Sequence, residues 1–189
     1  MTGVQTCALP IYEHALIAGP PRSGRSSALI SIAATVLAGR QPPTVVAFAP
    51  RRSPLRGLAA PVIVCEDYAE LDRTLEPIEG RALLLVDDAD TVPDPLGVLD
   101  RWIAKAGPGR HVIAAGRNDG IRRQYGLWTQ RVREGRCGVL LVPDHEMDSD
   151  LLGTALPRQH RMAPMPGRGY LVSDGAIDGV QLVLAEAAA

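Results

Sequence analysis

The stretch Gly19-Pro-Pro-Arg-Ser-Gly-Arg-Ser26 decides the fold that this sequence predicts. Its spacing matches the phosphate-binding loop Gly-x-x-x-x-Gly-Lys-[Ser/Thr], with Arg25 where the motif has lysine. The apolar run Ala15–Ala18 precedes the loop and indicates a strand, and the apolar-rich stretch Ser27–Ala38 follows it and is long enough for a helix. A strand, a glycine-containing loop and a helix in this order are the context in which the motif binds phosphate.

The loop contains the groups that bind a nucleotide phosphate chain. Glycines allow successive backbone N–H groups to converge on phosphate oxygens, and the N-terminus of the following helix adds partial positive charge. The hydroxyl of Ser26 stands at the motif position that ligates Mg²⁺. ATP and Mg²⁺ are therefore the predicted cofactors. The predicted nucleotide-binding residues are Gly19, Pro20, Pro21, Arg22, Ser23, Gly24, Arg25, Ser26 and Ser27.

Arg25 is the departure from the motif. Lysine reaches the outer phosphates as a compact charge on a flexible stem, whereas the planar fork of arginine is larger and needs a different geometry. Phosphoryl transfer depends mostly on positioning and on the placement of charge. We therefore expect the loop to bind nucleotide but not to support efficient independent hydrolysis. The alternative is a decayed loop that keeps its shape for packing and binds nothing.

Two carboxylates, Asp87 and Asp88, directly follow the apolar run Ala82–Val86. Ligands of an open α/β sheet bind beyond the carboxyl ends of its strands. In P-loop proteins an aspartate at this place holds Mg²⁺, so Asp87 is a predicted metal ligand together with Ser26. Asp88 is the catalytic candidate, because it stands where related ATPases carry a glutamate that polarises the attacking water. A surface turn of acidic residues is the alternative.

A further strand end adds polar candidates. The apolar run His111–Ala115 is followed by a polar turn. In a P-loop sheet this turn lies beside the γ-phosphate, so Arg117 and Asn118 are predicted phosphate sensors, and Arg117 is a catalytic candidate. The alternative is a turn in which Asn118 or Asp119 caps a helix.

The remaining patterns alternate between strands and helices, which predicts an α/β fold with a mainly parallel central sheet. The 169–172 and 179–184 segments around Asp174-Gly175 predict a C-terminal pair of strands. Further strands are expected at 44–49, 61–65 and 138–142, and helices at 68–75, 96–105 and 121–134.

Composition places the chain among globular domains. Its 189 residues are enough for one α/β domain with a core. The net charge of -1 gives no overall field for nucleic acid, and no run of eighteen apolar residues is present to span a membrane. Cys7, Cys65 and Cys137 lack the spacing of a zinc site or a disulfide framework, which favours a reducing cytoplasm.

The first eleven residues are left out of the fold prediction. Met1–Ile11 resembles the in-frame translation of a common sequencing adapter, and it lacks the basic and apolar regions of a signal peptide. We therefore expect a single domain over residues 12–189, as a fragment of a larger protein whose natural sequence upstream of Tyr12 is missing.

Two charged segments leave alternatives open. The arginine-rich helix expected at 121–134 is interpreted as a solvated face, with a surface for a neighbouring subunit's phosphate or for DNA as alternatives. The acidic segment Asp144–Asp150 lacks the glycine and glutamate of an EF-hand loop, so a capped turn is expected in preference to a cation site. The residues of the helix expected to be partly buried are Tyr125, Leu127, Trp128 and Val132.

Taken in order, these motifs resemble a C-terminal ATPase domain of the FtsK/SpoIIIE family, in the actinobacterial group that includes the type VII secretion ATPases. The resemblance runs from Tyr12 to about Glu186. The P-loop is common to many families, whereas the Leu-Pro-Arg and Pro-Gly-Arg-Gly ending is more specific. The segments that carry the resemblance are Gly19–Ser27, Leu84–Asp90, His111–Arg117, Leu151–Arg158 and Pro166–Gln181.

The resemblance implies a RecA-like fold with helices on both faces of the sheet, hexameric rings with nucleotide between subunits, and tandem domains on one long, often membrane-anchored polypeptide. Family members pump DNA or export folded small proteins. Later domains of the secretion branch often have degenerate motifs and serve binding or regulation, and Arg25 and Asp88 place this chain with them. The predicted function is a cytoplasmic, hydrolysis-impaired ATP-binding domain with a regulatory or substrate-recruiting role. The alternatives are an active DNA translocase motor and a non-enzymatic interaction module.

Overall fold

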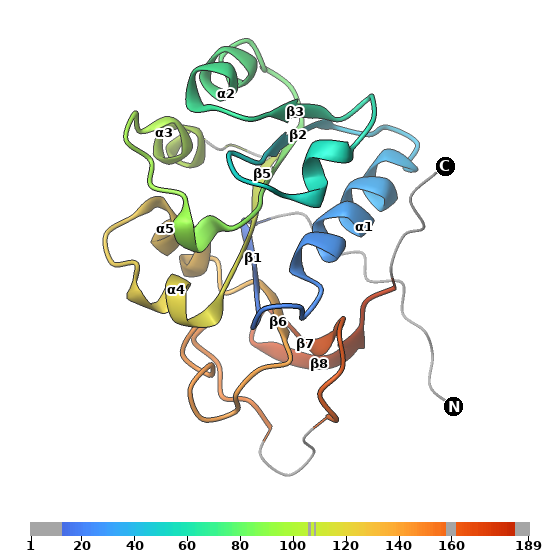
Figure 1. Cartoon of the computed structure of the whole chain (residues 1–189), viewed down its shortest axis with the longest axis vertical. Coiled ribbons are helices and arrows are strands. Elements are labelled where there is room, and N and C mark those ends of the chain that lie inside the picture. The colour runs from blue at the N-terminus through green and yellow to red at the C-terminus, as the bar shows by residue number, and fades with distance from the viewer. Residues whose placement is uncertain (1–12, 106, 108, 158–161, 184–189) are drawn as a thin grey trace.

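The computed structural model describes residues 13–105, 107, 109–157 and 162–183. Helices and strands alternate through most of this range (Figure 1). The strands are β1 (Ala15–Ala18), β2 (Thr44–Phe48), β3 (Ile63–Cys65), β4 (Ala82–Val86), β5 (Arg110–Gly116), β6 (Gly138–Leu141), β7 (Arg168–Ser173) and β8 (Ala176–Gln181). The helices are α1 (Arg25–Leu37), α2 (Tyr68–Leu75), α3 (Val98–Ala104), α4 (Asn118–Arg123) and α5 (Trp128–Glu134), with short 3₁₀ turns η1 (Pro54–Gly57) and η2 (Ala89–Thr91).

The strands form one sheet in the order β3-β2-β4-β5-β1-β6-β7-β8. Every pairing from β3 to β6 is parallel, and β7 and β8 extend the β6 edge in antiparallel fashion. This confirms the predicted α/β class, the mainly parallel sheet and the C-terminal β pair. The order also places β5 between β1 and β4, so the ends of these three strands lie next to one another.

Helices cover both faces of the sheet, because side chains of successive strand residues alternate between two apolar cores. Leu16 of β1 joins the core that contains residues of α2, α3, α4 and α5. Ile17 joins the other core, with Leu29 of α1 and Leu55 of η1. Figure 1 shows α1 on the side of the sheet opposite α2 to α5. Central strands such as β4 are buried at every position, as expected for parallel strands covered on both sides.

The strand predicted at 61–65 is shorter and less buried than expected. It occupies only Ile63–Cys65, and Ile63 is 42% exposed. The reason is its place in the sheet, since β3 pairs with β2 alone and forms an edge. An apolar run by itself does not distinguish an edge strand from a central one.

The single helix predicted at 121–134 is wrong, because the structure has two helices there. α4 ends at Arg123, and Gly126 adopts a left-handed φ of 68° before α5 begins at Trp128. Tyr125 is 80% exposed and Leu127 is also exposed, contrary to the prediction, because both lie in the connection between the helices. Trp128 and Val132 are buried as predicted.

Several sequence predictions concern residues that the structure does not describe. The eleven-residue leader and Cys7 lie outside the described residues, as does Leu184 at the end of the last predicted strand. Cys65 and Cys137 are buried. Within the described residues, no helix combines the length and the apolarity needed to cross a membrane.

Candidate nucleotide-binding site

Three adjacent strands bring the predicted site residues to one edge of the sheet. β1 leads into the loop at Gly19, β4 leads into Asp87, and β5 leads into Arg117. The N–H of Gly19 donates to the carbonyl oxygen of Gly116 at 3.3 Å, so the ends of β1 and β5 are in direct contact. This edge is where an open α/β sheet binds ligands.

Backbone geometry fixes the shape of the loop. Gly24 has a φ of 99° and precedes the first residue of α1, and a β-carbon there would lie 3.2 Å from the nitrogen of Gly167. A β-carbon on Gly19 would lie 2.4 Å from the Oγ of Ser23. No side chain caps the start of α1, which leaves this 13-residue helix with an uncapped N-terminus directed at the loop. Such a terminus favours an anion.

Buried polar atoms in the loop are left without partners inside the protein. Among the described residues, the Oγ of Ser23 and the Nε of Arg25 make no hydrogen bond although both atoms are buried. Buried polar groups are nearly always paired in folded proteins, and an unpaired one in a native structure calls for a ligand, a water or strain. The loop therefore has spare hydrogen-bonding capacity at the place where phosphate is expected.

Asp87 and Ser26, the two predicted metal ligands, lie in contact with each other. The hydroxyl of Ser26 donates to Oδ2 of Asp87 at 2.8 Å, and the N–H of Asp88 donates to Oδ1 at 3.0 Å. Asp87 is buried, with only 2% of the residue exposed. A hydroxyl beside a carboxylate is the hard oxygen donor set that suits Mg²⁺.

A metal held here would need additional ligands. Within the described part of the chain, no three His, Cys, Asp or Glu side chains gather closely enough to hold a metal ion by themselves. Magnesium is commonly bound through one or two carboxylates together with substrate phosphates and water. The residues present therefore fit a magnesium ion that arrives with a nucleotide.

Arg25 lies folded against its own loop. Its Nη1 donates to the carbonyl oxygens of Gly19 at 2.5 Å and of Pro20 at 2.9 Å. Its Nη2 lies 3.7 Å from Oδ1 of Asp88. The planar guanidinium thus contacts several acceptors at once, in directions fixed by its geometry. The ammonium of a lysine has no such fixed directions.

Asp88, the catalytic candidate, occupies a strained and partly buried position. Its φ of 47° is in the left-handed region. Burial and the neighbouring Asp87 raise its pKa above the usual range, and the nearby Arg25 opposes this shift. The carboxylate is therefore close to the loop, but it faces the Arg25 guanidinium.

The predicted sensors lie apart from the loop cavity. The Arg117 side chain pairs with Asp119 at 3.4 Å and is 48% exposed, while its backbone N–H donates to Asp90 at 2.9 Å. Asn118 donates to the Asp148 carboxylate. The alternative prediction, in which Asn118 or Asp119 caps a helix, is wrong. Helix α4 begins at Asn118 itself, and no side chain caps it.

A cavity of about 460 Å³ opens on the loop. This volume lies within the usual range for small-molecule sites. Two segments far along the chain close it, because the N–H of Gly167 donates to the carbonyl of Ser23 at 2.8 Å and the hydroxyl of Ser31 donates to the carbonyl of Val183 at 2.8 Å. Besides the loop and the start of α1, the cavity is lined by Pro54, Pro166, Gly167, Gln181, Leu182 and Val183.

The sequence prediction missed the segment that follows β2. From the sequence, residues 50–57 are assigned no functional role, whereas in the structure Leu55 is fully buried and Pro54 lines the cavity. The hydroxyl of Ser53 donates to Oδ2 of Asp87 at 2.5 Å. Only one general signal was available, namely that residues beyond the end of any central parallel strand are candidates for ligand contact.

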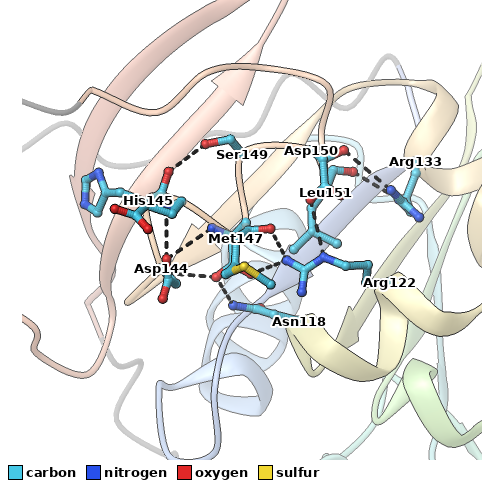
Figure 2. Close-up of polar contacts among 11 residues, drawn as sticks. Asn118, Arg122, Arg133, Asp144, His145, Met147, Ser149, Asp150 and Leu151 are labelled. Carbon is cyan, nitrogen blue, oxygen red and sulfur yellow. Dashed lines mark hydrogen bonds and ion pairs between the residues drawn. The ribbon is translucent and has the colours of Figure 1, made fainter.

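The acidic segment 144–150 is a capped turn, as predicted. Oδ1 of Asp144 accepts the N–H groups of Glu146 and Met147 at 2.9 and 3.1 Å. Figure 2 shows the side chains of Asn118 and Arg122 directed from α4 toward this turn. The segment contributes no metal cluster among the described residues.

The arginines around α4 and α5 are used largely within the chain. Arg122 pairs with Asp148 and Asp150, and Arg123 pairs with Asp119. The further partners are Asp100 for Arg131 and the carbonyl oxygen of Leu151 for Arg133. These contacts favour the interpretation of the basic segment as a solvated face over a surface for DNA or for a neighbouring subunit's phosphate.

Asp148→Ala is expected to lower the free energy of unfolding by about 1–3 kcal/mol, because it removes the buried acceptor of Arg122, Asn118 and the Asp144 N–H. Asp148 is buried, and its carboxylate accepts Arg122 at 2.7 Å and the N–H of Asp144 at 2.8 Å. Urea unfolding followed by circular dichroism measures the change. Asp150→Ala is the matched control, since Asp150 is 62% exposed and its pairing is expected to contribute less than about 1 kcal/mol. Equal losses in the two variants would contradict the prediction.

Comparison with known proteins shows the fold. An ATPase structure superimposes with a TM-score of 0.67 at 18% identity, covering 93% of this chain and 80% of that chain. The cytoplasmic domain of EssC gives a TM-score of 0.66 at 21% identity, over 92% of this chain and 38% of that chain. EssC (ATPases 2 and 3) from Geobacillus thermodenitrificans gives 0.67 at 17% identity, over 92% and 37%.

The chain thus spans less than two-fifths of each EssC structure that it matches. No protein-family model matches the sequence, and no curated protein does. The likenesses, together with the sheet order and the loop between β1 and α1, show that this chain has the RecA-like fold of ATPase domains.

Proposed function

We propose that this chain is an ATP-binding domain of a translocase or secretion ATPase in which hydrolysis is impaired. The observation that carries the proposal is the contact between Ser26, which lines the cavity beside the loop, and the buried carboxylate of Asp87, 2.8 Å away. A cavity alone or a loop motif alone is common in proteins. Their coincidence with a buried carboxylate of the correct geometry supports Mg·ATP as the ligand.

Each part of the site has a role in this proposal. The backbone N–H groups of residues 23–27 and the N-terminus of α1 hold the phosphates. Ser26 and Asp87 hold Mg²⁺, which when bound neutralises phosphate charge. The part of the cavity lined by Pro54, Pro166 and Leu182 would be available to the rest of the nucleotide.

Impaired hydrolysis follows from the contacts of Arg25 and Asp88. Efficient phosphoryl transfer needs a cation placed on the outer phosphates and a carboxylate that orients the attacking water. Here the Arg25 guanidinium bonds the carbonyls of Gly19 and Pro20 and faces Asp88. Both groups must leave these contacts before either can act, so we infer a domain that holds nucleotide more readily than it turns it over.

The setting of the domain is also a proposal. One matched structure is described as ATPases 2 and 3 of EssC, which means that several ATPase units lie on one chain there. We infer a similar arrangement for the parent protein of this domain, in the cytoplasm, with a ring-forming assembly that moves a secreted protein or DNA. In that assembly the domain has a regulatory or substrate-recruiting role.

Calorimetry with Mg·ATP, accompanied by an assay of phosphate release, tests the proposal on the wild-type chain and on Arg25→Lys. We expect the wild type to bind ATP with phosphate release close to background. Arg25→Lys is expected to raise turnover by about tenfold or more, since a lysine ammonium can reach the outer phosphates without occupying several loop carbonyls.

The other outcomes separate the alternatives. A folded chain that binds no ATP in either form would favour the non-enzymatic interaction module. Robust turnover by the wild type would contradict the assigned effect of Arg25, and stimulation of that turnover by DNA would indicate a motor.

A further inference from the structure

We propose that Ser53 is a positioning residue of the magnesium site, which orients the Asp87 carboxylate toward the cation. The inference rests on the proposed function, because it concerns the same site. The observation behind it is that two hydroxyl groups donate to the same carboxylate oxygen. Oδ2 of Asp87 accepts from Ser26 at 2.8 Å and from Ser53 at 2.5 Å.

The proton of Ser53 has one direction available in this arrangement. A hydroxyl carries a single proton and two lone pairs. The Oγ of Ser53 already accepts the N–H of Leu55 at 3.1 Å, where Ser53 caps the turn η1. Because a carboxylate can only accept, the proton at the Asp87 contact must come from Ser53. Such a charge-assisted bond is short and strong.

Ser53 also stands on a rigid support. The next residue, Pro54, has a fixed φ, and Leu55 is fully buried in the core beneath α1. The side chain of Arg56 donates to the carbonyl of Ala49 at 2.9 Å and closes the segment onto the end of β2. The hydroxyl is therefore held in place by the core and does not depend on the nucleotide.

The two hydroxyls differ in what a bound cation would demand of them. Ser26 would present a lone pair to the cation, and its contact with Asp87 must adapt to that. Ser53 lies on the segment after β2, outside the phosphate loop, and keeps its bond to Oδ2 whether or not the loop holds a nucleotide. It therefore fixes the rotation of the carboxylate, which is the role that outer partners play for metal ligands.

The test measures the affinity of this chain for ATP by calorimetry, once with Mg²⁺ and once with EDTA. The ratio of the two affinities isolates the contribution of the metal site. For Ser53→Ala we expect this ratio to fall by about 10- to 100-fold, with the affinity in EDTA unchanged. Ser53→Thr retains the hydroxyl and is expected to keep the ratio close to that of the wild type.

Asp67→Ala is the control for the loss of a cap. Asp67 caps α2 by accepting the N–H of Glu70 at 2.8 Å, and it lies outside the cavity lining. It is expected to lower the melting temperature, as Ser53→Ala does, while leaving the ratio unchanged. An unchanged ratio in Ser53→Ala, with ATP bound by the wild type, overturns the inference alone. Failure of the wild-type chain to bind ATP overturns the proposed function as well.

Discussion

Asp87→Ala is expected to lower the affinity for ATP in the presence of Mg²⁺ by about 100-fold. The carboxylate is buried and is the only acidic group that contacts the hydroxyl of Ser26 among the described residues. Removing it takes away a direct ligand for the cation or for its water. Affinity in EDTA is expected to stay the same or to rise, because a negative charge near the phosphates is removed.

The same substitution also carries a structural cost that must be separated. It leaves Ser26, Ser53 and the N–H of Asp88 without their acceptor, and unpaired buried groups cost about 1–3 kcal/mol each. Asp87→Asn is the matched variant, since it keeps the shape and one acceptor oxygen but loses the charge. Circular dichroism establishes that both variants fold, and calorimetry measures binding. Undiminished, Mg²⁺-dependent binding of ATP by a folded Asp87→Ala variant would contradict the assignment of Asp87 as a metal ligand.

The loop, the strand that precedes it and the buried carboxylate were predictable because each depends on local order in the sequence. A glycine that must adopt a φ of 99°, as Gly24 does, is visible in the motif itself. The apolar runs of β1 and β4 indicate strands covered on both sides. That β1 and β4 lie on either side of β5 follows once the class of fold is known.

The contact between Ser53 and Asp87 was not predictable, because it depends on which strands are neighbours. β2 pairs with β4 in parallel, with Phe48 opposite Val86, so the segments that follow the two strands start side by side. A single serine in an arginine-rich loop carries no pattern that reports this pairing. The side-chain orientation of Arg25 is likewise set by the carbonyl groups around it, and the motif shows only its position.

Gly138→Ala is expected to unfold the chain, or to lower its stability by more than about 4 kcal/mol, against a typical total of about 5–15 kcal/mol. A β-carbon at Gly138 would lie 2.0 Å from the carbonyl oxygen of Leu16, a backbone atom that cannot move aside. The residue has a φ of 154°, which L side chains rarely adopt. Leu16 and Gly138 are paired in register at the centre of the sheet, so relief of the clash requires β1 and β6 to separate.

Separation of these two strands would remove more than one pairing, since β6 carries β7 and β8 and, with them, the Gly167 wall of the cavity. Gly57→Ala is the control, because a β-carbon there meets no atom within 4 Å and its φ is not in the positive range. Thermal unfolding and soluble yield compare the two variants. A Gly138→Ala protein that melts within a few degrees of the wild type would show that β1 and β6 are not held this closely.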